Sequence, residues 1–411
     1  MSEHHLIIHR AANEIGGNCI EITSGETRVL FDFGLPLYSI GENEPARKYR
    51  LKISGVYKDD IPRVKAVFIT HAHPDHCGLL AELNSKIPVY AAPSAILLLK
   101  NIAPLFGNNF GHLHFIPLNP NETVSFDELK IKSIPLDHSI PQSYAYQIET
   151  GGKKILYTGD FRSHGKCSYL TKNLTLCKKP DYLILEGTTL NRPPQIALSE
   201  KSLQSKTEEL LRRNKLAIIY FSAQNLDRFI SVYNAARTLH KTIVIDPYTC
   251  FVLEQFSQLG KNIPQWYWPN IRVYFANNTI TKKLKEIKYR YKTKKIFLKE
   301  ILSEPSKYVI KDNSNIRLKL LRLTKEVSLI HSAWPGYLEK DCLFKENSEI
   351  FKLPIDILHT SGHADFDTLS HLIREVSPRF LIPIHTCRAQ EYQSLFKVPA
   401  LPLKNGEILD I

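Results

Sequence analysis

The sequence predicts an α/β fold in which one domain is inserted into another. Short strands separated by turns fill the first 190 residues, whereas helices alternate with single strands from Ser199 onward. The strand-rich style returns near residue 353. Regular alternation of strands and helices is typical of a mainly parallel sheet. The two changes of style therefore mark the two ends of an insertion.

The flanking parts contain the expected strands of the first domain. Runs with the length and composition of strands cover 6–8, 18–22, 29–33, 64–70, 89–91, 131–134, 144–148, 155–157 and 182–186. After the insertion we expect a strand over 355–359, a helix over 365–376 and a strand over 380–384. The first domain is thus predicted to comprise residues 1–195 and 353–411.

The insertion is predicted over residues 196–352, after the turn-forming run Asn191-Arg192-Pro193-Pro194. A helix should run to about Arg213, followed by a strand over 216–221, a helix over 225–240 and a strand over 242–245. This order is typical of βαβ units.

The composition is that of a folded globular protein, with 43% hydrophobic and 23% charged residues in 411. No apolar run approaches the roughly 18 to 20 residues of a membrane span, and the first residues lack the apolar core of a signal peptide. We therefore expect a cytoplasmic protein without a membrane partner. Seven cysteines without a C-x-x-C pair indicate reduced thiols and not a thiolate zinc site.

The charge balance favours a polyanionic partner. Lysine and arginine exceed aspartate and glutamate to give a net charge of +13, and nucleic acid is the commonest partner of such proteins. The segment 281–300 holds nine Lys or Arg against two Glu, interleaved with Tyr289, Tyr291 and Phe297. Such residues suit phosphates and stacked bases, but a solvated amphipathic helix has the same pattern.

A cluster of candidate metal ligands follows the apolar run 67–69: His71, His73, Asp75 and His76. In an extended segment, residues two apart point the same way, so His71 and His73 can share one cation while Asp75 and His76 address a second. Imidazole and carboxylate together suit zinc, with manganese as the alternative. Further candidates stand at other expected strand ends: His138, Asp160 and His385.

The order of these residues resembles the metallo-β-lactamase superfamily. Within it, Leu183–Thr188 resembles motif A of the β-CASP nucleases, His359–Ala364 resembles motif B and Pro383–Thr386 resembles motif C. The opening Ala12–Asn18 and the closing Asn405–Ile408 are similar in style to ribonuclease J and its relatives. The resemblance implies a four-layered αββα metallo-β-lactamase sandwich with an inserted α/β β-CASP domain.

The resemblance also implies two divalent ions, zinc in the first place. One would be held by His71, His73, His138 and Asp160, and the other by Asp75, His76, Asp160 and His385, so that Asp160 bridges. Family members that act on RNA carry a histidine at motif C, where the DNA-repair branch usually has an apolar residue. His385 therefore favours RNA.

Catalytic roles are expected for Asp75, Glu186 and His363, with His363 as a general acid oriented by Glu186. Alternatively, Glu186 holds His76 or His385. The residues expected to bind substrate are His359, Thr360, Ser361, Gly362 and His363, together with Ser222 and Asn225. The last two could bind phosphate at a helix N-terminus, or simply cap that helix.

The sequence thus predicts a metal-dependent ribonuclease that cleaves single-stranded RNA with a hydroxide activated by two ions, by an exonucleolytic or endonucleolytic route. Alternatives are a DNA nuclease of the same fold, a metallohydrolase of small thioesters or lactams, and a non-catalytic RNA-binding scaffold. The expected partner is single-stranded RNA, and a homodimer is compatible with the sequence.

Overall fold

The computed structural model describes residues 3–39, 44–192, 198–213, 215–260, 262–276, 279–340 and 342–411. The chain divides into two compact units, each described here by itself. Unit 1 comprises the described residues of 1–163, 167–196 and 362–411, and unit 2 those of 164–166 and 197–361. Within the described ranges, no helix is both long enough and apolar enough to cross a bilayer.

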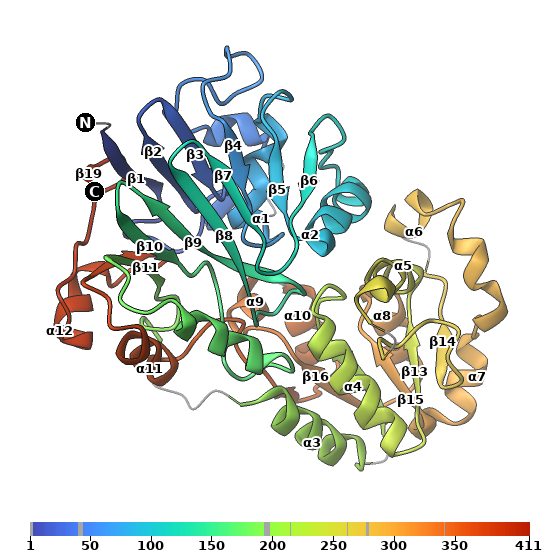
Figure 1. Ribbon diagram of the computed structural model, residues 1–411. Coiled ribbons are helices and arrows are strands. Elements are labelled where there is room, and N and C mark those ends of the chain that lie inside the picture. Colours follow the sequence, from blue (N-terminus) through green and yellow to red (C-terminus); the bar gives the residue numbers. More distant parts are fainter. Residues whose placement is uncertain are drawn as a thin grey trace. The chain divides into compact units, whose positions relative to one another are not determined.

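Unit 1 contains two sheets (Figure 1). The first has seven strands in the order β19-β1-β2-β3-β4-β5-β6. Their bounds are β1 His4–Arg10, β2 Cys19–Ser24, β3 Thr27–Phe31, β4 Ala66–Phe68, β5 Val89–Ala91, β6 Phe115–Pro117 and β19 Ile408–Asp410. The chain ends thus meet in one sheet, because β19 pairs antiparallel with β1.

The second sheet of unit 1 has six strands in the order β18-β11-β10-β9-β8-β7. The bounds are β7 Thr123–Phe126, β8 Leu129–Leu136, β9 Ser143–Thr150, β10 Lys153–Tyr157, β11 Tyr182–Glu186 and β18 Phe380–Ile384. Strands β10, β11 and β18 run parallel, so the carboxyl ends of three strands lie at one edge. This edge carries part of the candidate site.

The two sheets pack face to face through an aromatic core. The ring of Tyr146 on β9 lies 5.4 Å from that of Phe31 and 5.7 Å from that of Phe68, which come from β3 and β4. Helices α1 (Pro74–Cys77) and α2 (Pro93–Leu97) lie beside the first sheet (Figure 1). Helix α11 (Phe366–Val376) buries its apolar side on the second. The remaining helices of unit 1 are α12 (Tyr392–Phe396) and the short turns η1 Leu37–Ser39, η2 Ala46–Tyr49, η3 Gly78–Glu82, η4 Leu98–Ile102, η5 Ala103–Phe106, η6 Ser168–Leu176 and η10 Ala389–Glu391.

This arrangement confirms the predicted α/β class with an αββα sandwich. The helix expected over 365–376 begins one residue later, because the Asp365 side chain accepts a hydrogen bond from the Thr368 backbone N–H as the N-cap of α11. The strand expected over 64–70 is shorter and covers only Ala66–Phe68. The residues that follow it form the loop of metal ligands.

Unit 2 is built on a six-stranded parallel sheet in the order β14-β13-β15-β12-β16-β17. The strands are β12 Leu216–Tyr220, β13 Thr242–Ile245, β14 Ile271–Val273, β15 Tyr308–Lys311, β16 Val327–His331 and β17 Ile355–Ile357. The helices are α3 Glu200–Leu211, α4 Leu226–Thr238, α5 Pro247–Phe256, α6 Thr279–Lys283, α7 Leu298–Ser303, α8 Ser314–Leu323, α9 Gly336–Lys340 and α10 Cys342–Ile350, with the turns η7 Ser257–Leu259, η8 Lys288–Lys294 and η9 Pro305–Lys307.

One boundary of the insertion differs from the expectation. The predicted strand 355–359 is β17, which ends at Ile357 and pairs with β16 at the edge of the unit 2 sheet. Unit 1 resumes only at Gly362. A strand of only three residues, Ile-Asp-Ile, does not reveal which sheet it joins. The other predicted boundary, between 195 and 196, lies outside the described residues.

Candidate metal centre

The seven predicted metal ligands all lie in unit 1, at the ends of strands or in the turns that follow them. The first four occupy the loop after β4 and the single turn α1, where Pro74 starts the helix. The others follow β8, β10 and β18. Side chains of these residues form groups whose ligand atoms lie within 4.8 Å of one another: His71, His73 and His138; His71, His76 and Asp160; Asp75, His76 and His385.

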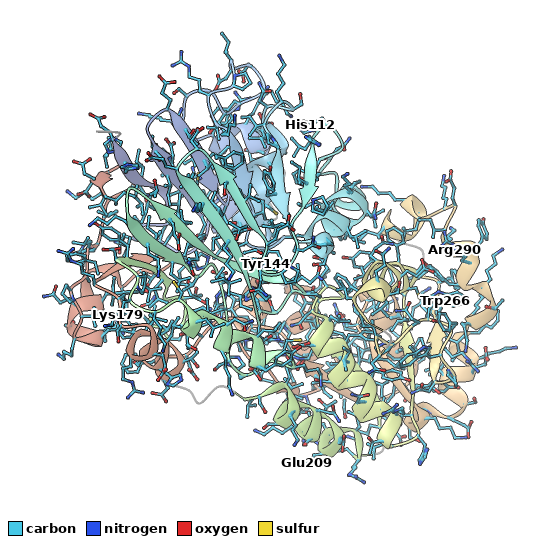
Figure 2. The ribbon with its side chains drawn as sticks, viewed as in Figure 1. His112, Tyr144, Lys179, Glu209, Trp266 and Arg290 are labelled. Carbon is cyan, nitrogen blue, oxygen red and sulfur yellow. The ribbon has the colours of Figure 1, made fainter. Side chains whose placement is uncertain are left out.

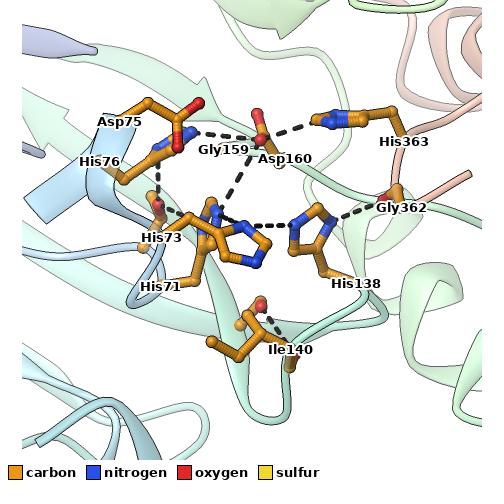
Figure 3. A network of polar contacts seen from close by, with 12 residues as sticks. His71, His73, Asp75, His76, His138, Ile140, Gly159, Asp160, Gly362 and His363 are labelled. Atoms are coloured by element: carbon orange, nitrogen blue, oxygen red, sulfur yellow. Dashed lines mark hydrogen bonds and ion pairs between the residues drawn. The ribbon is translucent and has the colours of Figure 1, made fainter. Parts of the chain in front are cut away.

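Three imidazoles converge at the first group (Figure 3). His73 Nδ1 lies 2.9 Å from His71 Nε2 and 3.2 Å from His138 Nε2. His138 Nδ1–H donates to the Gly362 carbonyl at 2.6 Å, which leaves the lone pair of Nε2 directed at the group. A single proton cannot satisfy three nitrogens that face one another, whereas one cation can bind all three.

Burial keeps these imidazoles neutral, as metal ligation requires. It lowers the pKa of His71 and His138 well below the usual value and lowers the pKa of His73 to about 4. In each case loss of hydration is the largest cause.

The second group combines two imidazoles with carboxylates. His385 Nε2 lies 3.3 Å from Asp75 Oδ2, and His76 Nε2 lies 3.1 Å from Asp160 Oδ2. Burial would raise the pKa of Asp75, but the hydrogen bond from His385 and the charge of His76 hold it well below its usual range. The carboxylate is therefore ionised.

Asp160 stands between the two groups. Its Oδ2 atom faces His76 and lies 3.9 Å from His71 Nε2, while its Oδ1 atom is buried without a hydrogen-bond partner. A buried carboxylate oxygen without a partner is costly. The donor set and this bare oxygen therefore fit divalent cations at both groups.

Side chains outside the predicted set orient the ligands, and sequence reasoning missed them. Asp32, which is fully buried after β3, accepts from His76 Nδ1–H at 2.7 Å and from Tyr157 Oη–H at 2.7 Å. Thr188 Oγ1 lies 2.7 Å from His385 Nδ1. Such partners fix which ring nitrogen faces a metal. A lone carboxylate directly after the apolar run 29–31 was the available signal for Asp32.

Backbone contacts hold Asp75 in place. Its carbonyl oxygen accepts hydrogen bonds from the Gly17 and Asn18 N–H groups at 3.0 and 2.9 Å. Gly34 packs so closely that a Cβ atom there would lie 1.8 Å from the same oxygen. The glycines of the opening motif and of the loop after β3 thus serve this close approach.

The predicted catalytic pair is also together. His363 Nδ1 lies 3.1 Å from Glu186 Oε2 and 3.6 Å from Asp160 Oδ2. Burial opposes protonation of His363, but the negative charges of Glu186 and Asp160 outweigh it and raise the pKa of the imidazole. Glu186 thus contacts His363, and its other oxygen accepts from the Phe161 N–H.

The predicted substrate-binding residues are divided between the units. Gly362 and His363 belong to unit 1, and the other members of the predicted set belong to unit 2: Ser222, Asn225, His359, Thr360 and Ser361. Asn225 is the N-cap of α4 and accepts from the Arg228 N–H, while Ser222 Oγ accepts from the Gln224 N–H. These local hydrogen bonds explain the positions of both side chains without a ligand. Their role in binding phosphate therefore stays a prediction.

Comparisons with known proteins agree with this architecture. The family described as "Beta-lactamase superfamily domain" matches residues 27–212. A crystal structure of a protein of unknown function from Enterococcus faecalis V583 superposes with a TM-score of 0.83 at 19% identity and covers 100% of both chains. That likeness shows the fold alone, while residues 27–212 are similar to the β-lactamase superfamily domain.

Relatives in sequence are named as ribonucleases. The chain is 22% identical over 396 residues to ribonuclease J of Helicobacter pylori (strain ATCC 700392 / 26695), covering 90% of this chain and 54% of that protein. It is 26% identical over 444 residues to an RNase J-like protein of Methanocaldococcus jannaschii, covering 99% of each. A ribonuclease J of Pyrococcus abyssi is 21% identical and covers 90% and 87%. The chain thus spans about half the length of the Helicobacter relative and nearly all of the Methanocaldococcus one.

Proposed function

We propose that this protein is a metal-dependent ribonuclease of the β-CASP type that hydrolyses phosphodiester bonds of single-stranded RNA. The observation that carries the proposal is the placement of the His363–Glu186 pair beside Asp160, the residue shared by two groups of ligand atoms. The likeness to ribonuclease J over most of the chain supports the choice of RNA.

The residues that would hold two divalent ions are those of the two groups. His71, His73 and His138 would bind one ion, and Asp75, His76 and His385 the other, with Asp160 shared. When bound, such ions stabilise negative charge on phosphate oxygens and lower the pKa of water. Nitrogen-rich donors favour zinc over manganese.

His363 supplies the proton in this proposal. Its Nδ1–H is held by Glu186, so the proton at Nε2 is the one available to a departing 3′ oxygen. The negative charges of Glu186 and Asp160 raise the pKa of His363 and so favour its protonated form, and a general acid typically contributes about a hundred- to ten-thousand-fold to the rate. Asp75 and His76 would act by holding the second ion.

Cleavage of labelled RNA tests the proposal. Purified protein is incubated with a 5′-labelled single-stranded RNA and with DNA of the same sequence, with zinc or manganese or with chelator. We expect RNA cleavage that chelator abolishes, with DNA cut more slowly. Preferential cutting of DNA would instead favour the DNA nuclease of the same fold, and inertness toward both would overturn the proposal. Product lengths distinguish exonucleolytic from endonucleolytic cutting.

A further inference from the structure

The segment 282–299 of unit 2 forms a basic surface that contains exposed aromatic rings and lies outside the metal centre. It runs from the end of α6 through η8 to the start of α7. Tyr289 and Phe297 are 56% and 49% exposed, so both rings are accessible to solvent. Exposed lysines surround them: Lys282, Lys285, Lys292, Lys295 and Lys299, with the half-exposed Lys288.

The lysines lie against the rings. Lys292 Nζ is 4.0 Å from the centre of the Tyr289 ring and Lys288 Nζ is 5.7 Å from it, while Lys295 Nζ is 4.3 Å from the centre of the Phe297 ring. At both Tyr289 and Phe297, an ammonium group thus lies against an exposed aromatic ring. An exposed cation–π contact stabilises less than a stacked nucleobase does, so a base can displace an ammonium group from a ring while that group moves to the phosphate.

Other basic residues of the segment have structural partners. Arg290 pairs with Glu254, which also accepts from Tyr291 Oη–H and Trp266 Nε1–H. Figure 2 shows Arg290 and Trp266 near each other at this part of unit 2. Lys294 donates to the Trp268 carbonyl. These contacts anchor the segment on its buried side and leave Tyr289, Phe297 and their lysines to face solvent.

We propose that the 282–299 surface binds single-stranded RNA, with unpaired bases stacked on Tyr289 and Phe297 and phosphates held by Lys288, Lys292 and Lys295. This deepens the proposed function, on which it rests, by assigning an RNA contact that is separate from the metal ligands. The rings favour RNA over an anionic membrane or an acidic protein because they are interleaved with the charges, as stacking platforms for single strands are. A duplex hides its bases and should bind less well.

Binding is measured by fluorescence anisotropy with a labelled 30-nucleotide uridine-rich RNA in excess chelator, so that cleavage does not interfere. We expect Tyr289→Ala to weaken binding about five- to 150-fold, the range for loss of one stacked base. The triple variant K288A/K292A/K295A should lower the slope of log affinity against log salt by about 2, since each phosphate contact to a single strand contributes about 0.7.

The matched control is K201A/K206A/K319A, which removes the same charge from exposed positions on α3 and α8. It should keep the parental slope. Equal weakening by the control, equal affinity for a duplex of the same length, or preferential binding to phosphatidylserine vesicles would each overturn the proposal. Binding is measured without metal, so its outcome is independent of cleavage. If the Tyr289 and lysine variants bind RNA like the parent while the parent cleaves RNA, only the surface proposal fails. If the parent binds RNA through this surface but cleaves no RNA, only the proposed function fails.

Discussion

At the scale of single residues, two neighbouring histidines of the centre have different hydrogen-bond and ion-pair contacts. His363 contacts Glu186 and Asp160, whereas His385 contacts Asp75 and Thr188. Glu186 and His363 nevertheless lie within ligand distance of Asp160 and His385. Geometry alone therefore leaves His363 as either an acid or a ligand.

Alanine variants separate these roles. His363→Ala should lose about a hundred- to ten-thousand-fold in RNA turnover with both ions retained, because the proposal assigns its ring to Glu186 and to proton transfer and not to an ion. His385→Ala should lose turnover together with the second ion. Turnover on RNA and metal content are measured on the same preparations. Loss of an ion from the His363 variant would assign that residue to the metal, and near-parental turnover would remove it from the mechanism.

Thr188 is expected to orient His385. Its hydroxyl donates to the His385 carbonyl at 3.4 Å and so accepts from Nδ1–H at 2.7 Å, which orients the ring with Nε2 toward Asp75. Thr188→Val keeps the shape but loses this contact, and we expect affinity for the second ion to fall about 10- to 100-fold. Thr188→Ser should restore it. Competition with a chromophoric chelator gives the affinity, and an unchanged value in the valine variant would refute this role.

At the scale of elements, the centre depends on how closely the loop after β3 approaches α1. In Gly34→Ala the new methyl group collides with the Asp75 carbonyl, so the backbone must move. We expect a loss of about 2 kcal/mol or more in the free energy of unfolding, together with loss of the second ion. Urea unfolding and metal analysis measure both.

The control for this variant is Gly260→Ala, since no atom lies within 4 Å of a Cβ atom built there. It should change stability by less than about 0.5 kcal/mol. If Gly34→Ala matches this control in stability and metal content, the close approach has no role in the centre.

The strand pair β2–β3 carries an acid-sensitive contact. Burial would raise the pKa of Glu21, but hydrogen bonds from His9 and Arg28 outweigh it and lower the pKa to about 2. Since the unfolded value is about 4.3, the stabilisation is complete above that pH and is lost as pH falls toward 2. Between pH 6 and pH 3 the loss should be about 1 to 2 kcal/mol.

Glu21→Gln should remove this part of the acid dependence, whereas Glu26→Gln, in the exposed turn between the same strands, should retain it. Urea unfolding at the two pH values measures the difference. Identical pH dependence of Glu21→Gln and the parent would show that this contact does not contribute.

The sequence revealed elements with a strong local pattern better than short ones. The helix at 365–376 was predictable because an N-cap aspartate precedes an amphipathic run. Of the three-residue strands, β5 was predicted over 89–91, whereas β6 and β14 were not, because so short a run gives little periodicity to distinguish it from a loop. For the same reason β17 could not be assigned to its sheet from its own residues.

The candidate site shows the same contrast. His71 to His76 are adjacent in sequence, so their common target could be inferred from spacing. The hydrogen bonds of Asp32 and Thr188 to ring nitrogens join residues 44 and 197 positions apart. Both contacts arise because distant segments pair as neighbouring strands, β3 with β4 and β11 with β18, and local patterns do not show that pairing.

At the scale of the whole molecule, the seven predicted ligands come from four separate segments that converge in unit 1. Strand ends from both sheets of unit 1 bring the ligands together, and the net charge of +13 suits a polyanionic substrate. Asp160 lies in one group of possible ligands with His71 and His76 and in another with Glu186, His363 and His385, and we predict that it bridges the two ions.

Metal content of the Asp160→Ala variant therefore tests the central claim most directly. Purified parental protein and the variant are loaded with zinc, desalted and analysed for ions per chain, with circular dichroism as the control for folding. We predict two ions per chain in the parent and weakened binding of both in the variant. A folded Asp160→Ala protein that retains two ions per chain would contradict the bridging centre.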